Sequence, residues 1–339
     1  MNSRQHAERL LGEAPAFLEV LDHVSQVAPL DKPILIVGER GTGKELIAAR
    51  LHYLSGRWDQ EYVKMNCAAI SESLLETELF GHEAGAFTGA TKMHQGRFER
   101  ADKGSLFLDE LATTSALVQE KLLRIIEYGE YERVGGSKTL NVDVRLIAAT
   151  NEDLPSLANE GKFREDLLDR LAFDVITLPP LRARPEDIIL LAEQFAVTMA
   201  SDLGMEFFPG FSEKAIETLL DHQWPGNVRE LKNVVERSVY RAPDDGTPVD
   251  MITLDPFDSI FRPARPGEKS NATTTSAAEP NRHSFPLDFK QTVQDYEINL
   301  LQKALAASQF NQKKTAETLG VTYHQLRGYM KKYDLFESD

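Results

Sequence analysis

The feature that most constrains this chain is one glycine-rich segment, Gly38-Glu39-Arg40-Gly41-Thr42-Gly43-Lys44. It follows an apolar run at 33–37, typical of a buried strand, and a helical pattern at 45–53 comes directly after it. Glycines let backbone N–H groups turn inward around phosphate oxygens, and the amino end of a helix adds partial positive charge. The segment therefore predicts a strand–loop–helix unit that binds nucleotide phosphates. A chance glycine-rich turn is the alternative.

Strand-like and helix-like patterns alternate along the first 180 residues. Apolar runs at 105–108 and 144–149 are each followed by polar residues, which predicts an α/β fold with a parallel sheet covered by helices on both faces. Later patterns at 188–199, 212–221 and 227–240 are helical, and a Pro-, Ser- and Thr-rich stretch separates them from further helices. We expect an α/β subdomain at 1–178, a helical subdomain at 179–242, a flexible linker at 243–286 and a helix-turn-helix domain at 287–339.

Polar side chains stand where two of the predicted strands end. Asp109 and Glu110 follow one strand, and Thr150-Asn151 ends the next. Ligands of α/β folds bind at the carboxyl ends of parallel strands, so Asp109 suits a magnesium ion, Glu110 suits the general base that activates water, and Asn151 suits the γ-phosphate. A solvated acidic turn is the alternative for the carboxylate pair.

The predicted cofactors are ATP and Mg²⁺. Lys44 is expected to reach the β- and γ-phosphates. The position that usually carries a Ser or Thr ligand for magnesium is Glu45 here, so Thr42 and Asp109 are the candidate metal ligands. The nucleotide contacts expected from the sequence are Gly38, Glu39, Gly41, Thr42, Gly43, Lys44, Glu45, Asp109, Asn151 and Arg229.

Three arginines complete the candidate site. Arg164 and Arg170 flank leucines in one helical segment, and six residues place them about 120° apart around a helix axis. Arg229 follows Trp224-Pro225-Gly226 and lies at the start of another helical pattern. A surface arginine is usually only solvated, and the surrounding motifs favour a functional role for these.

The whole ordered set resembles the AAA+ ATPases. Within them, the hexapeptide Gly85-Ala86-Phe87-Thr88-Gly89-Ala90, downstream of 78–83, resembles the loop of bacterial enhancer-binding proteins, and of their phage shock branch most. That family activates RNA polymerase carrying sigma-54. The resemblance implies a homo-hexameric ATPase that binds enhancer DNA and remodels the closed promoter complex into an open one. It also implies that Phe87 and the other residues of the hexapeptide contact sigma-54. The catalytic residues that it implies are Glu110, with Asn66 hydrogen-bonded to it, and Arg164 and Arg170, which act on the site of a neighbouring subunit.

The carboxyl-terminal segment is basic in an otherwise acidic chain. Net charge is −15 overall, but residues 311–333 hold five Lys or Arg and one acid, which favours docking on DNA phosphates. Ala316, Gly320 and Leu326 have the spacing of a helix-turn-helix. Gly320 is expected to end the first helix in the left-handed conformation, and Thr322 to cap the second. A helical hairpin with a solvated basic face is the alternative. The expected DNA contacts are Lys313, Lys314, Thr322, Tyr323, His324, Gln325, Arg327 and Lys331.

Composition and chain layout bear on location and control. A lone cysteine, Cys67, and no apolar run long enough for a signal peptide or membrane span predict a cytoplasmic protein without membrane insertion. The phosphate loop begins close to Met1, so we expect control by an inhibitory phage shock protein bound in trans. Trp58 is either its contact or an edge residue packed on the domain. A rival function, replication initiator or helicase loader, would leave the hexapeptide unused, and a nucleotide-sensing repressor would not need Glu110.

Overall fold

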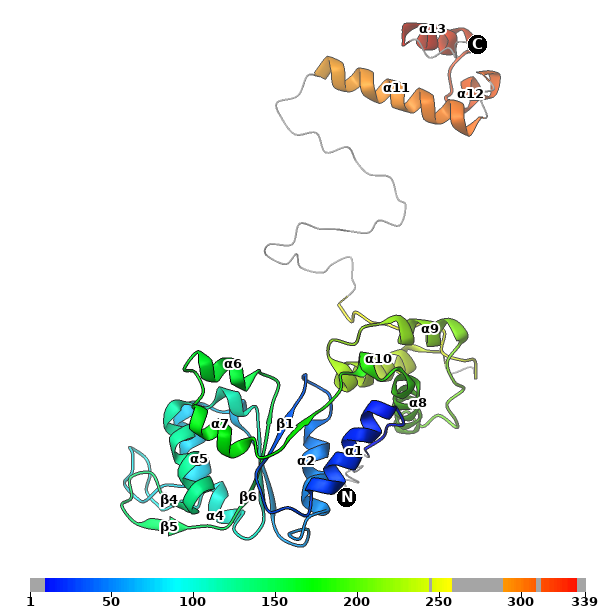
Figure 1. Ribbon diagram of the computed structural model, residues 1–339. Coiled ribbons are helices and arrows are strands. Elements are labelled where there is room, and N and C mark those ends of the chain that lie inside the picture. Colours follow the sequence, from blue (N-terminus) through cyan, green and yellow to red (C-terminus); the bar gives the residue numbers. More distant parts are fainter. Residues whose placement is uncertain (1–9, 244–245, 258–288, 309–311, 334–339) are drawn as a thin grey trace. The chain divides into compact units, whose positions relative to one another are not determined.

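The chain was analysed as a computed structural model that describes residues 10–243, 246–257, 289–308 and 312–333. It divides into two compact units, residues 1–260 and 261–339, and each is described by itself (Figure 1). Within the described ranges, no helix combines the length and the apolar character that crossing a bilayer requires.

The first unit is built on a five-stranded parallel sheet with the strand order β2-β3-β6-β1-β7. The strands span Tyr62–Asn66 (β2), Ser105–Asp109 (β3), Arg145–Thr150 (β6), Ile34–Val37 (β1) and Val175–Thr177 (β7). The central strands β1, β3 and β6 are almost wholly buried, which explains their continuous apolar sequence. The predicted parallel sheet is confirmed.

Helices cover both faces of this sheet, as expected (Figure 1). Ile34 and Ile36 pack under α1 (Pro15–Val27) and α2 (Lys44–Tyr53), whereas Leu35 belongs to the core on the opposite face. That second face is covered by α3 (Glu72–Phe80), α5 (Ala116–Tyr128), α6 (Leu154–Asn159) and α7 (Glu165–Leu171), with the short α4 (Arg97–Arg100) beside them. The alternation of side chains along β1 thus divides one strand between two cores.

A small antiparallel hairpin was not foreseen in the sequence. Strands β4 (Glu130–Glu132) and β5 (Thr139–Asn141) follow α5, whose end is set by Gly129 in the left-handed conformation at φ 70°. Each strand has only three residues, which is too short for a recognisable periodic pattern of apolar residues. The hairpin carries the loop 133–138 at its tip.

Three helices form a third hydrophobic core within the first unit. They are α8 (Pro185–Asp202), α9 (Glu213–Asp221) and α10 (Asn227–Arg241), in agreement with the helical patterns of the sequence. Trp224 is fully buried at their centre and donates its indole N–H to the carbonyl of Leu219. The chain then returns along the helices, where Val249 pairs with Phe211. We refer to this region as the lid.

The second unit contains α11 (Phe289–Ala307), α12 (Gln312–Thr318) and α13 (Tyr323–Lys332). Leu301, Leu305 and Leu326 form its core with the small Ala316 between them. Gly320 is left-handed at φ 67°, and the Thr322 hydroxyl accepts the N–H of Gln325. Both helix-end predictions are confirmed.

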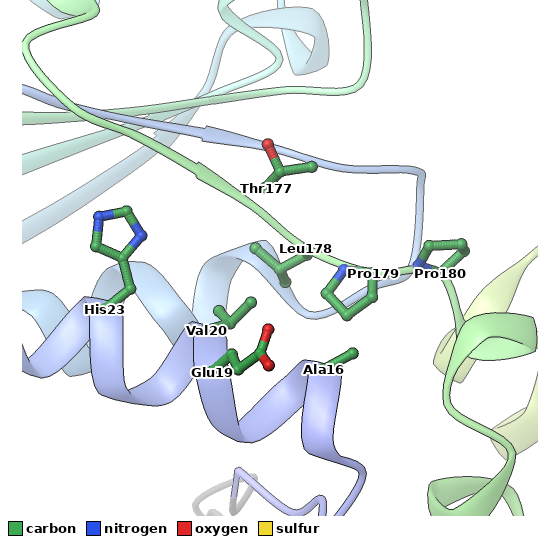
Figure 2. A pocket seen from close by; sticks show the side chains of 8 residues that line it. All are labelled: Ala16, Glu19, Val20, His23, Thr177, Leu178, Pro179 and Pro180. Carbon is green, nitrogen blue, oxygen red and sulfur yellow. The ribbon is translucent and has the colours of Figure 1, made fainter.

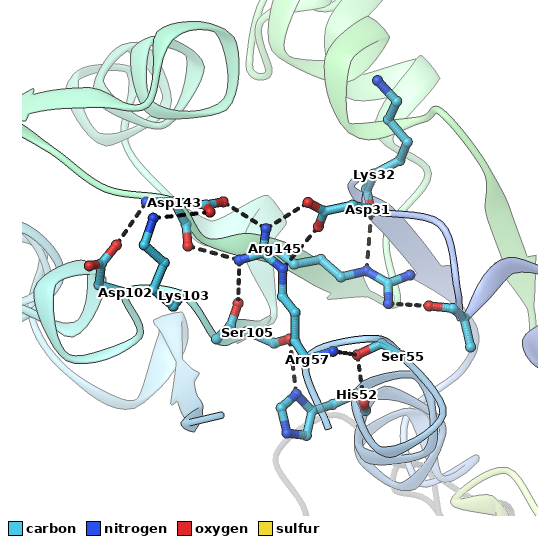
Figure 3. Close-up of polar contacts among 12 residues, drawn as sticks. Asp31, Lys32, His52, Ser55, Arg57, Asp102, Lys103, Ser105, Asp143 and Arg145 are labelled. Carbon is cyan, nitrogen blue, oxygen red and sulfur yellow. Dashed lines mark hydrogen bonds and ion pairs between the residues drawn. The ribbon is translucent and has the colours of Figure 1, made fainter. Parts of the chain in front are cut away.

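A polar network holds the sheet together at the amino ends of β3 and β6 (Figure 3). The Arg57 guanidinium bonds Asp31 at 2.6 and 3.0 Å, and it also bonds Asp143 at 2.6 Å. Buried Arg145 donates instead to backbone carbonyls, including those of Ala28 at 2.6 Å and Val27 at 3.2 Å, where α1 ends. Cationic groups stabilise the carboxyl ends of helices, so Arg145 ties α1 to the sheet.

Candidate functional site

The phosphate loop connects β1 to α2 and presents unpartnered backbone donors. Gly41 and Gly43 have φ angles of 77° and 100°, and a Cβ atom on Gly43 would meet nothing within 4 Å. Gly43 caps α2 without any side-chain hydrogen bond, so the first N–H groups of that helix face the open side of the loop. Lys44 Nζ donates to the carbonyls of Gly38 at 2.8 Å and Glu39 at 3.0 Å. This is a cradle of phosphate size with a cation at its rim.

Carboxylates stand at the adjacent strand end, as the sequence predicted. Asp109 is half-buried, and burial raises its pKa while the N–H of Glu110 and the Lys44 charge act in the opposite direction. Glu110 adopts left-handed backbone angles, and its carboxylate lies 3.8 Å from the Arg40 guanidinium. Hard oxygen donors beside a phosphate cradle fit a magnesium ion bound together with a nucleotide.

The expected contact between Asn66 and Glu110 is not made in this structure. Asn66 lies at the end of β2, donates to Asp109 Oδ2 at 3.4 Å and accepts the N–H of Ala68 at 2.9 Å. The prediction of an Asn66–Glu110 hydrogen bond is therefore wrong for this conformation. The reason is that the turn at Glu110 directs its carboxylate toward Arg40.

Other expected nucleotide contacts also have protein partners. The Thr42 hydroxyl is buried and donates to the Glu39 carbonyl at 2.9 Å, so it does not face a metal, and its expected role as a magnesium ligand is not supported by this geometry. Glu45 forms an ion pair with Lys64 at 2.7 Å. Asn151 follows β6, which lies beside β1, and its amide donates to Glu152 at 3.4 Å.

The lid contacts the phosphate loop directly. Arg229 lies in the first turn of α10, and its Cβ would be 3.1 Å from a Cβ placed on Gly41. Burial lowers the pKa of Lys44, and the charge of Arg229 adds to this effect. Sequence analysis missed two further residues here, Arg182 and Asn227, which both bond the Glu39 carboxylate. Asn227 lies two residues before Arg229, in the same sequence motif, but its role was not visible because its partner Glu39 is 188 residues away along the chain.

The paired arginines lie on the exposed side of the first unit. Arg164 is the residue before α7 rather than part of the helix, and it makes a bidentate bond to Asp166 at 2.7 and 3.0 Å. Arg170 is in the last turn of α7 and bonds Glu127 at 2.8 Å. The prediction that both arginines lie in one helix is therefore wrong for Arg164, which precedes the helix by one residue. The expected angle of about 120° between them around a helix axis does not apply.

The hexapeptide forms the tip of an exposed loop. The N–H of Gly85 donates to the Ala90 carbonyl at 2.7 Å, which closes the tip on itself. Phe87 is 46% exposed and rests edge-on against His82, whereas Ala90 is buried and presents no side chain to a partner. The base of the loop is fixed by Arg133, which bonds Glu83 and Glu99 at 2.6 to 2.8 Å.

A shallow hollow lies between α1 and the end of β7 (Figure 2). Ala16, Val20 and Leu178 form its apolar wall, and His23 bonds Asp174 at 3.0 Å near one end. The hollow is lined by Ala16, Glu19, Val20, His23, Thr177, Leu178, Pro179 and Pro180. None of these residues belongs to the phosphate loop.

In the second unit, the expected DNA contacts lie on α12, on α13 and at the turn between them. Lys313, Lys314, His324, Arg327 and Lys331 are exposed. The Gln325 side chain, in contrast, accepts from the N–H and the hydroxyl of Thr322, both at 2.9 Å, and closes a capping box. Tyr323 is partly buried and donates to Gln312 at 3.4 Å. Because the Gln325 side chain is used to cap α13, it is not free to contact a base as expected.

Comparison with known families gives three consecutive matches. Residues 10–177 match the sigma-54 interaction domain, residues 182–273 the AAA+ ATPase lid domain, and residues 292–333 the bacterial regulatory proteins of the Fis family.

Individual proteins resemble the chain over most of its length. The Psp operon transcriptional activator of Escherichia coli is 59% identical over 98% of this chain and 99% of its own. The Nif-specific regulatory protein of Azotobacter vinelandii is 48% identical over 75% of this chain and 48% of its own. Crystal structures of NtrX from Brucella abortus in complex with ATP and ADP are 32% and 33% identical, with TM-scores of 0.66 and 0.67, over 96% of this chain and 69% of theirs.

Proposed function

The chain belongs to the sigma-54-dependent transcriptional activators, and from this premise we propose that it is the ATPase that opens the polymerase closed complex at phage shock genes. One observation carries the proposal. A phosphate cradle with an adjacent carboxylate pair and an exposed Phe87 loop belong to the same compact unit, so nucleotide chemistry and partner contact share one core. We place this activity in the cytoplasm.

Hydrolysis follows from the groups around the cradle. Lys44 and the amino end of α2 would orient the phosphates of the nucleotide, and Asp109 would hold a magnesium ion, which would neutralise charge on those phosphates. Glu110 takes the proton of the attacking water, a role that contributes about 10²–10⁴-fold to the rate. Glu110 would be free to reach the water once the phosphates of a nucleotide compete with it for Arg40.

The route from the cradle to the loop is short. Asn66 caps the turn Cys67–Ala69, α3 follows, and the loop begins at Gly81. Leu79 and Phe80 are fully buried and hold the end of α3 in the core, so a movement of this helix would carry it as a unit rather than bend it. We infer that a shift of Asn66 between Asp109 and Glu110 tilts α3 and lifts Phe87 toward sigma-54.

Assembly and DNA binding complete the proposal. The side chains of Arg164, just before α7, and Arg170, in its last turn, are exposed, and a neighbouring subunit of a homo-hexamer would receive them as trans-acting arginines. The second unit would bind double-stranded enhancer DNA through exposed Lys and Arg of α12 and α13.

We also propose control by an inhibitory phage shock protein bound in trans. Trp58 is 62% exposed, and Tyr53 nearby along the chain is 63% exposed. Aromatic side chains of this kind often dominate protein interfaces, which favours the contact interpretation of Trp58 over that of an edge residue packed on the domain.

Two variants test the function. Thr88→Ala should retain ATP hydrolysis and lose open-complex formation with sigma-54 holoenzyme, because it changes the exposed loop tip and leaves the cradle intact. Glu110→Gln should bind ATP and hydrolyse it poorly. Full promoter opening by Thr88→Ala would remove the loop from the mechanism. Wild-type protein that hydrolyses ATP but opens no sigma-54 promoter would instead favour the replication-initiator or helicase-loader alternative.

A further inference from the structure

The Glu39 carboxylate lies at the junction of three segments that are far apart in the sequence. Arg182, in the short helix Leu181–Ala183 before the lid, bonds its two oxygens at 2.5 and 2.9 Å. Asn227, the first residue of α10, donates to the same carboxylate at 3.0 Å. The bond to Arg182, followed by that to Asn227, lowers the pKa of Glu39 to about 2, so this carboxylate stays ionised at any physiological pH.

Asn227 is committed to this junction by its whole side chain. Its amide nitrogen also donates to the Arg40 carbonyl at 3.0 Å, and its amide oxygen accepts the N–H of Leu181 at 2.8 Å. The residue is fully buried and has a positive φ of 52°. A non-glycine residue persists in this region only where its surroundings hold it there, which indicates that the network determines the conformation at the start of α10.

The backbone of α10 also contacts the phosphate loop directly. The N–H of Val228 donates to the Gly41 carbonyl at 3.0 Å. A Cβ atom on Gly41 would lie 2.3 Å from the Gly226 carbonyl oxygen and 3.1 Å from the Arg229 Cβ. The phosphate loop at Gly41 thus lies directly against the start of α10, so closely that no side chain would fit at this position.

We propose that Glu39, Arg182 and Asn227 form a coupling network that fixes Arg229 of the lid relative to the phosphate loop. Glu39 is then a positioning residue that acts through its carboxylate, and not a nucleotide ligand through that group. A carboxylate repels phosphate, so a glutamate at position 39 would be unfavourable as a phosphate ligand. Its bonds to Arg182 and Asn227 explain why a glutamate stands in the phosphate loop. This inference rests on the proposed ATPase function and specifies how the lid takes part in it.

The test replaces Arg182, which lies outside the cradle and is partly exposed. Arg182→Gln removes the charge, and Arg182→Lys keeps the charge but not the two-point geometry. Lys214→Gln is the matched control, because it removes another lid ion pair, that with Asp250 at 3.6 Å, away from the loop. The full chain is used throughout.

Two measurements decide the matter. In nucleotide-free protein, hydrogen exchange of the amides in 226–231 should rise in Arg182→Gln and stay unchanged in Lys214→Gln. In steady-state hydrolysis, Arg182→Gln should lower kcat about tenfold, as expected when a positioning group is lost, and Arg182→Lys should restore part of it. In an Arg229→Ala background, Arg182→Gln should change kcat by less than about twofold, because coupled residues do not add.

Unchanged exchange at 226–231 in Arg182→Gln would overturn the coupling, and so would a full tenfold effect in the Arg229→Ala background. Wild-type protein without ATP hydrolysis would instead refute the proposed function, while the exchange measurement would still decide on the coupling.

Discussion

Glu110 is held in a conformation that its own backbone disfavours. Its φ and ψ angles of 53° and 42° lie in the left-handed region, which costs an ordinary residue about 1–2 kcal/mol. Asparagine tolerates this region better, so Glu110→Asn should recover about 1 kcal/mol. The lost contact with Arg40 subtracts little, since the two groups are 3.8 Å apart and Arg40 is largely exposed.

The expected result combines higher stability with lower activity. For a unit of this size, about 1 kcal/mol raises the unfolding midpoint by roughly 2–4 °C, while loss of the general base lowers ATP turnover by about 10²–10⁴-fold. Circular dichroism during heating and a phosphate-release assay measure the two effects. A midpoint that stays the same or falls would refute the backbone argument, and undiminished turnover would remove Glu110 from catalysis.

Lys103→Asn is the matched control. Lys103 also has a positive φ, 66°, but it precedes the amino end of β3, whereas Glu110 follows the carboxyl end of that strand, and it pairs with exposed Asp143 at 3.3 Å. Its replacement should raise the midpoint by a similar or slightly smaller amount and leave turnover unchanged. A stability gain shared by both variants, with loss of turnover in Glu110→Asn alone, separates the strain from the chemistry.

Three further outcomes follow from the described contacts. Arg145→Met should lower the free energy of unfolding by about 3 kcal/mol in urea, because it strands buried carbonyls at the end of α1; a loss below about 1 kcal/mol would contradict this. Hydrogen bonding to Arg57 lowers the pKa of Asp143, so its contribution is present above the unfolded pKa and is lost as pH falls through the lower folded value. Arg57→Gln should therefore weaken the dependence of stability on pH below about pH 4, and an unchanged acid profile would refute the assignment. Lys331→Ala should weaken enhancer binding evenly across sequences and reduce the salt slope by about one; a loss confined to one base pair would mean that Lys331 contacts a base.

The sequence predicted the parts of the fold that rest on local patterns. The strand at 33–37 and the glycine-rich turn after it are contiguous, and their periodicity and φ requirements are visible without any partner. The same holds for Gly320 and Thr322, which end and begin helices through their own backbone and hydroxyl group. Short edge strands such as β7, with three residues, gave no such signal.

The direction of side chains at the site was beyond the sequence. Glu39 bonds partners 143 and 188 residues away, and no spacing rule relates them. The family resemblance paired Asn66 with Glu110, yet in the structure Asn66 donates to Asp109, because the turn at Glu110 directs the Glu110 carboxylate toward Arg40. Motif spacing predicts which residues meet at an edge, and the local backbone decides which of them bond.

The described site groups also share a feature that bears on regulation. Lys44 bonds its own loop carbonyls, Glu110 faces Arg40, Arg164 holds Asp166, and Arg170 holds Glu127. Each of these contacts is local, and the ion pairs are solvent-accessible, so they contribute little to stability. A phosphate group or a neighbouring subunit that offers a stronger charge-assisted bond can therefore displace them at low cost. If the proposed function holds, these groups would stay paired within the chain until nucleotide and neighbouring subunit are both in place, and hydrolysis would depend on assembly.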